Sequence, residues 1–207
     1  NKGGKPIATV LPGTALGIGF ELPLATHRIF AADNPKAKIG LPEILVGLFP
    51  GAGGTIRLVR KLGAMVAAPF LLEGKTLPPA KAKAAGLIDS VSADPMADAR
   101  AWVLNATEAD LIKPWDQKGY KMPGGTPYHP SGFMTFIGAS AMVHGKTQGA
   151  YPAAKALLSA VYEGAQVPFE TALKIEARWF TSVLMNPSSE AMIRSLFLDK
   201  GALEKGA

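Results

Sequence analysis

The sequence has no cysteine, only three histidines and no long apolar run. Without cysteine, the 207 residues can form no disulfide, no thiolate nucleophile and no Cys-based zinc site. His27, His129 and His144 are expected to be structural or surface residues, so no metal site is predicted. Gly, Pro and charged residues interrupt every apolar stretch well before the roughly 18 residues of a membrane span. The opening "NKGGKPIATV" lacks the apolar core of a signal peptide, which favours an intracellular protein or one that is trimmed at its front.

The positive charge is spread along the chain. The formal net charge is +6, but the 22 lysines and arginines form no run of five or more and do not alternate with aromatic residues. This pattern does not favour nucleic-acid binding. A basic face that meets a phosphorylated small molecule explains the charge equally well.

The first half of the sequence alternates strand and helix patterns. Apolar and β-branched residues within 5–12 predict a buried strand, and a helix is expected near 19–28. A second strand is expected over 27–33, then a strand and loop over 39–47. Residues 49–63 predict a Gly-rich turn that opens into an amphipathic helix. This order predicts an α/β fold.

The second half is predicted to be helical, with an irregular connection before it. Helical patterns continue to residue 106, and Leu87-Ile88 resembles a short strand. Pro, Gly and aromatic residues crowd 113–132, which predicts an irregular segment. Three helices are expected beyond it, the last one capped by Asn186 with Pro187 at its first position. The predicted division of the chain is 1–106, 107–150 and 151–207.

The stretch "PGTALGIGFEL" places a carboxylate beside a glycine-rich turn. Gly17 and Gly19 allow backbone conformations that can aim an N–H group outward where a helix begins. Such a donor can stabilise an oxyanion, and Glu21 beside it could exchange a proton or orient water. Two plainer interpretations stay open: Glu21 as a first-turn acid that complements the helix dipole, and Glu43 as a solvated loop acid.

Three motifs in order resemble the enoyl-CoA hydratase, or crotonase, family. They are "PGTALGIGFEL", "GLPEILVGLFPGAGGTIRL" and "LLEGKTLPPAKAKAAGLIDSV". Residues 107–207 further resemble the multifunctional alpha subunits of bacterial fatty-acid oxidation, in which a hydratase module runs into a hydroxyacyl-CoA dehydrogenase. The resemblance implies an α/β fold of the crotonase (ClpP-like) type, a spiral of ββα units that is N-terminally incomplete here and is followed by a helical extension.

The resemblance also implies a mechanism and roles for individual residues. Glu21 would help to activate a water molecule, Glu43 would deliver a proton to the α-carbon, and the backbone N–H of Ile18 would stabilise the enolate. The family usually has glycine where Ile18 stands, so a β-branched side chain here could narrow the acyl pocket. The substrate pocket would be lined by Gly17, Gly19, Pro50 and Gly51.

The activity implied is the hydration of trans-2-enoyl-CoA to 3-hydroxyacyl-CoA in fatty-acid β-oxidation. Hydration needs no cofactor beyond the coenzyme A of the thioester substrate. NAD is expected only for a dehydrogenase domain. The stretch "GIGFEL" is not a dinucleotide fingerprint, because Leu22 stands where that motif needs its last glycine. The resemblance implies a bacterial cytoplasmic protein, an oligomer and a thiolase subunit as partner. It also implies that these residues are an internal piece of a longer polypeptide. Two alternatives remain open: an enoyl-CoA isomerase on the same fold, and a non-catalytic scaffold.

Overall fold

Short strands form two small sheets in the computed structural model, which describes residues 4–206. One sheet has the order β1-β3-β6 with parallel neighbours, and the other has the order β2-β4-β5 with a parallel and an antiparallel pair. The strands are β1 (Ala8–Leu11), β2 (Ala15–Leu16), β3 (Arg28–Ala32), β4 (Ile39–Gly40), β5 (Thr76–Leu77) and β6 (Ser90–Ser92).

The chain passes repeatedly from the first sheet to the second and then into a helix. β1 and β2 are followed by α1 (Ile18–Leu24). β3 and β4 are followed by the 3₁₀-helix η1 (Glu43–Val46) and then by α2 (Gly54–Leu62). This repeat confirms the predicted α/β class and its ββα units. Because β2 and β4 run parallel, their carboxyl ends lie at the same edge, where the N–H of Gly17 donates to the carbonyl of Gly40 at 3.1 Å.

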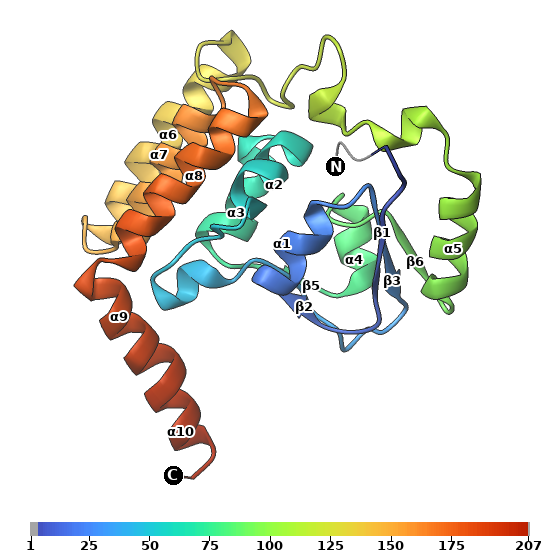
Figure 1. Ribbon diagram of the computed structural model, residues 1–207. Helices are drawn as coiled ribbons and strands as arrows, with labels where there is room; N and C mark the ends of the chain where they lie inside the picture. Colours follow the sequence, from blue (N-terminus) through green and yellow to red (C-terminus); the bar gives the residue numbers. More distant parts are fainter. Residues whose placement is uncertain (1–3, 207) are drawn as a thin grey trace.

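Further helices cover the sheets. In Figure 1, α5 (Pro95–Asn105) lies on the outer side of the sheet that contains β1, β3 and β6. Its Trp102 ring packs against Phe30 of β3, with ring centroids 6.3 Å apart. The helices of this part are α3 (Ala64–Leu72), α4 (Pro79–Ala84) and α5 (Pro95–Asn105). The predicted strand at Leu87-Ile88 is wrong, because the strand β6 begins two residues later, at Ser90.

The sequence predicted an irregular segment between the two parts of the chain, but residues 107–150 are irregular only in part. Its first part holds two short 3₁₀-helices, η2 (Glu108–Leu111) and η3 (Pro114–Asp116), but its second part is the long helix α6 (Pro130–Thr147). His129 caps α6, since its side chain accepts from the N–H of Ser131. Gly138 and Gly145 weaken the helical pattern of α6, whereas packing against α3 and α7 (Pro152–Gly164) stabilises the helix.

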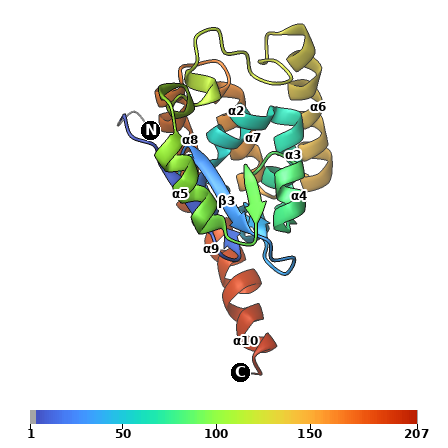
Figure 2. The same ribbon diagram turned by 90° about the vertical axis from the view of Figure 1, so that its right-hand side faces the viewer.

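The C-terminal part forms the three predicted helices. α7 (Pro152–Gly164) and α8 (Phe169–Leu184) pack side by side (Figure 1). The third begins, as predicted, with Asn186 as cap and Pro187 at its first position in α9 (Pro187–Ile193). It continues through the π-helical η4 (Arg194–Asp199) into α10 (Lys200–Glu204). Figures 1 and 2 both show α10 pointing away from the rest of the molecule.

One hydrophobic core runs through both halves of the chain. Leu157 of α7 and Val183 of α8 belong to the same buried cluster as Phe20, Phe49 and Leu58. Trp179 and Phe180 of α8 are partly buried and pack against this cluster. The packing therefore crosses the predicted divisions at residues 106 and 150. Within residues 4–206, no helix is both long and apolar enough to cross a bilayer.

Candidate active site

The paired ends of β2 and β4 bring Gly17 and Glu43 together. Gly17 precedes α1 with φ 56° and ψ −131°, a conformation that favours glycine. A Cβ atom at this position would lie 3.3 Å from Oε1 of Glu43, so the absence of a side chain lets the carboxyl group approach the turn. Two residues that the sequence predicted as part of one site are therefore neighbours.

The turn leads directly into α1, whose first residue is Ile18. The first N–H groups of a helix have no partner within it, so the N–H of Ile18 is available to an acceptor from outside the helix. The Ile18 side chain is 56% exposed and does not contribute to the core. Gly19 also faces open space, since no atom lies within 4 Å of a Cβ placed there. Among the described residues, no side chain packs over Gly19.

Glu21 is buried and held by the backbone at the start of α2. Its Oε2 accepts hydrogen bonds from the N–H groups of Ala52 at 2.8 Å and Gly54 at 2.7 Å. Burial raises the pKa of Glu21 above its ordinary value, and these N–H groups and the charge of Arg57 offset only part of that rise. A Cβ at Gly54 would lie 2.6 Å from Cγ of Glu21, so the contact depends on glycine. The donors favour the carboxylate form of this side chain.

Glu43, in contrast, has a buried carboxyl group without a hydrogen-bond partner among the described residues. Desolvation, helped by the negative charge of Glu21, raises the pKa of Glu43 to about 7, although its own backbone N–H lowers it. At neutral pH a large fraction of Glu43 therefore carries a proton. The two carboxyl groups are close enough to affect each other. Burial raises the pKa of both, and backbone N–H groups and Arg57 oppose that rise at Glu21.

The glycine-rich turn before α2 lies next to Glu21. Pro50 is buried, and its carbonyl accepts from Oγ1 of Thr55 at 2.9 Å. Gly51 lies against the aromatic ring of Phe180 on α8, and a Cβ atom at Gly51 would overlap that ring. Gly53 has a φ of 90° and precedes α2. Pro50 and Gly51 thus precede the backbone donors of Glu21, and their role in lining a substrate pocket stays a prediction.

The sequence analysis missed a third buried glutamate, Glu176 of α8. This side chain is fully buried and accepts hydrogen bonds from the N–H of Gly53 and, at 2.8 Å, from that of Ile56. Burial, and to a lesser extent the charge of Glu21, raise the pKa of Glu176 to about 8. One signal was available: Glu176 lies four residues after Ala172 and seven before Val183, in phase with the buried face of α8.

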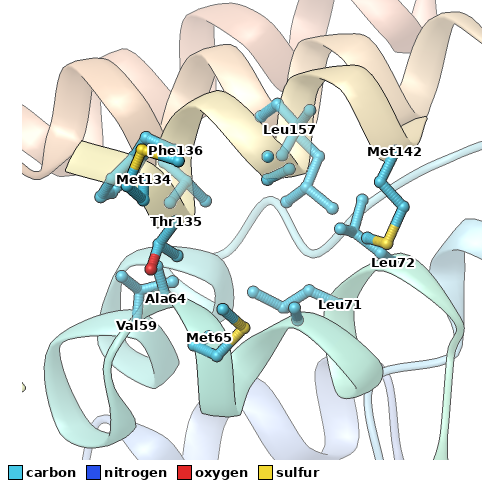
Figure 3. A pocket seen from close by; sticks show the side chains of 15 residues that line it. Val59, Ala64, Met65, Leu71, Leu72, Met134, Thr135, Phe136, Met142 and Leu157 are labelled. Atoms are coloured by element: carbon cyan, nitrogen blue, oxygen red, sulfur yellow. The ribbon is translucent and has the colours of Figure 1, made fainter. Parts of the chain in front are cut away.

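A separate apolar pocket lies between α3, α6 and α7. Figure 3 shows Met65, Leu71 and Leu72 of α3 facing Met142 and Leu157 from the other two helices. Its volume is about 160 Å³, and none of the predicted site residues lines it. Among residues 4–206, no group of three or more His, Asp or Glu side chains is placed to hold a metal ion.

This arrangement can be compared with known proteins. Residues 2–109 match the enoyl-CoA hydratase/isomerase family, which is slightly more than half of the chain. The chain therefore belongs to the enoyl-CoA hydratase/isomerase family.

Longer relatives match nearly the whole chain. A protein of Shewanella amazonensis named fatty acid oxidation complex subunit alpha is 34% identical over 201 residues, and the one of Vibrio parahaemolyticus is 32% identical over 205 residues. Each alignment covers 97% of this chain and 28% of the relative, so the chain spans somewhat more than a quarter of the length of these proteins.

Solved structures show the same fold. An enoyl-CoA hydratase from Mycobacterium avium subsp. paratuberculosis aligns with a TM-score of 0.56 at 18% identity, covering 97% of this chain and 62% of that one. A carnitinyl-CoA hydratase from Mycobacterium avium aligns with a TM-score of 0.55 at 24% identity, covering 90% and 57%. At these identities the likeness concerns the fold alone.

Proposed function

We propose that this chain carries the catalytic glutamates of an enoyl-CoA hydratase that converts trans-2-enoyl-CoA to 3-hydroxyacyl-CoA in fatty-acid β-oxidation. The observation that carries the proposal is the pair Glu21 and Glu43. These are two buried carboxyl groups, one bound by backbone N–H groups and the other placed against Gly17 without a hydrogen-bond partner among the described residues. Addition of water to a conjugated thioester needs both a base and an acid. Family membership and the relatives named for a fatty acid oxidation complex support the same activity.

The chemistry assigns the two glutamates different steps. Glu21, ionised and fixed by the N–H groups of Ala52 and Gly54, accepts a proton from a water molecule as its oxygen bonds to the β-carbon. Glu43 then gives its proton to the α-carbon. The reaction leaves Glu21 protonated and Glu43 ionised, and proton exchange with solvent restores both groups for the next cycle.

Between these two steps, negative charge develops on the thioester oxygen. The N–H of Ile18 lies at the positive end of α1 and is the donor that this chain would offer to that oxygen. The backbone angles of Gly17, φ 56° and ψ −131°, together set the direction in which this N–H points. Enolate stabilisation at this turn would place the reacting carbons near Glu43, which lies against Gly17.

The direct test replaces each glutamate by its neutral isostere in the intact protein. Glu21→Gln and Glu43→Gln should each lower kcat for hydration by about 10²- to 10⁴-fold, the range expected for loss of a general acid or base. The rate is followed by the loss of the conjugated enoyl-thioester absorbance. The matched control is Glu73→Gln, because Glu73 is exposed and caps the C-terminus of α3. This variant should keep the full rate. Near-normal rates in both site variants would exclude the assignment.

Mass spectrometry of the products separates the two alternatives. Hydration raises the product mass by one water, whereas a double-bond isomerase leaves the mass unchanged. Binding of acyl-CoA without any product would indicate a non-catalytic module. If the product is isomerised and only one of the two variants, Glu21→Gln or Glu43→Gln, loses activity, the isomerase is favoured.

The resemblance extends to partners that lie outside these 207 residues. We infer an oligomeric assembly in the bacterial cytoplasm with a thiolase subunit, supported by relatives named as subunits of a fatty acid oxidation complex. An NAD-dependent dehydrogenase in the same polypeptide likewise stays a prediction.

A further inference from the structure

Two glutamate carboxyl groups accept hydrogen bonds from the N–H groups of residues 52–56, which comprise the end of the glycine-rich turn and the first residues of α2. Glu21 accepts from Ala52 and Gly54, whereas Glu176 accepts from Gly53 and Ile56. Each side chain thus takes two donors from a segment of only five residues. Any shift of the turn that lengthens the bonds of one glutamate must alter those of the other.

Glu176 comes from a distant part of the chain and has no other visible role. Its side chain is wholly buried, and its two oxygens accept hydrogen bonds from the backbone of residues 53 and 56. It is separated from Gly53 by 123 residues. A carboxyl group is costly to bury, so its position is explained by the backbone donors that it satisfies.

Other contacts fix α8 against the same turn. The ring of Phe180 lies against Gly51, and Arg60 of α2 donates to the carbonyls of Gly164 and Val167 at 3.1 and 2.6 Å, just before α8. The register of α8 relative to α2 is therefore set independently of Glu176.

The charged groups around Glu176 are also shared with Glu21. Arg57 of α2 interacts with Glu176, with Glu21 and with Glu170 of α8, and it donates to the carbonyl of Ala52 at 3.0 Å. One arginine thus balances the acids on both sides of the turn.

We propose that Glu176 is a positioning residue of the active site: it holds the 52–56 turn in the conformation that presents two N–H groups to Glu21. This inference rests on the proposed hydratase function, and it adds the helical extension to the catalytic unit. Glu176 itself touches no reacting atom; it acts through the backbone on the base.

The test uses Glu176→Gln and Glu176→Asp in the intact protein. Gln keeps one acceptor oxygen and puts an NH₂ group opposite the other N–H donor, so one of the two bonds to the turn is lost. Asp keeps both acceptors on a shorter side chain. Glu163→Gln is the matched control, because Glu163 joins α7 to α8 through Arg178 and Trp179 without contacting the turn.

Three readouts are expected to change together. In Glu176→Gln, kcat should fall about 10- to 100-fold with little change in KM, as for a catalytic group displaced by a fraction of an ångström. The acidic limb of the pH profile of kcat/KM should move to higher pH, because a loosened turn no longer lowers the pKa of Glu21 as effectively. Amide hydrogen exchange of the 52–56 segment should accelerate. Glu176→Asp should recover part of each effect, and Glu163→Gln should show none.

The outcomes separate this inference from the proposed function. A wild-type protein that hydrates enoyl-CoA, with Glu176→Gln unchanged in kcat, pH profile and exchange, overturns the positioning role. Equal changes in Glu163→Gln also overturn it, because they would show a general loss of helix packing. If the wild type does not hydrate enoyl-CoA, the hydratase proposal fails, and faster exchange confined to 52–56 in Glu176→Gln still supports the control of the turn.

Discussion

Glu21 and Glu43 carry the same chemical group in different surroundings. Two backbone donors and Arg57 oppose the effect of burial at Glu21, whereas the oxygens of Glu43 have no partner among the described residues. The motifs in the sequence predicted both positions. Glu176 was not predicted, because its contact to Gly53 spans 123 residues and no short pattern records such a pairing.

The difference between the two glutamates predicts a bell-shaped pH dependence of kcat/KM. Glu43 must be protonated to act as the acid, so the rate should decline as pH rises through about 7, the pKa to which burial raises Glu43. Glu21 must be ionised, so the rate should also decline toward acid pH. Steady-state kinetics from pH 5 to 10 at constant ionic strength measure both limbs. A rate that keeps rising above pH 9 would exclude Glu43 as the proton donor.

At the scale of elements, α9 supports the 3₁₀-helix that carries Glu43. Oγ of the buried Ser189 donates to the carbonyl of Gly47 at 2.8 Å, and a Cβ at Gly47 would lie 2.8 Å from Sδ of Met192. Gly47 ends η1 with φ 77°. Thus α8 contacts the turn that holds Glu21, and α9 contacts the turn that holds Glu43.

The contact between α9 and η1 gives a prediction at this scale. Ser189→Ala should destabilise the protein by about 1–3 kcal/mol, because it leaves a buried carbonyl without a donor. The midpoint of denaturant unfolding and the kcat for hydration should both decrease. Ser188→Ala, on an exposed neighbouring residue, is the control and should change neither. Full stability of Ser189→Ala would show that α9 does not hold η1.

Most elements could be predicted from sequence, and the failures have local causes. β1, β3, α2 and the start of α9 follow clear patterns of apolar residues and caps. The strand β5 has only two residues, too few for a periodic pattern, and it exists because Thr76 pairs with Gly40. The helix α6 was missed because glycines interrupt its pattern, while α3 and α7 supply the packing that stabilises it.

At the scale of the whole molecule, the core joins parts of the chain that sequence composition divides. Leu157 of α7 is 1% exposed within the cluster that also contains Phe20 and Phe49. The family match ends at residue 109, before α7 and α8 begin. The sequence-based boundaries at 106 and 150 thus describe changes of composition, and the packing continues across them.

A single shared core predicts that the two parts lose stability together. Leu157→Ala should cost about 2–5 kcal/mol, as for other large-to-small changes in cores. Native-state hydrogen exchange should then accelerate in β1 and β3 as well as in α7, because these elements open as one unit. Leu104→Ala, at a position that is 76% exposed, is the control. Acceleration limited to the C-terminal helices would indicate two separate domains.

The distance along the chain between Ile56 and Glu176 has a consequence for biosynthesis. The two residues are 120 positions apart, so at about 5–20 residues per second the ribosome needs about 6–24 s to pass from one to the other. During that interval the nascent chain already contains Glu21, Glu43 and the glycine-rich turn, but it does not yet contain the carboxyl group of Glu176. The site is therefore completed only after synthesis has passed α8. Until then, the N–H groups of Gly53 and Ile56, which donate to Glu176 in the folded protein, are open to water.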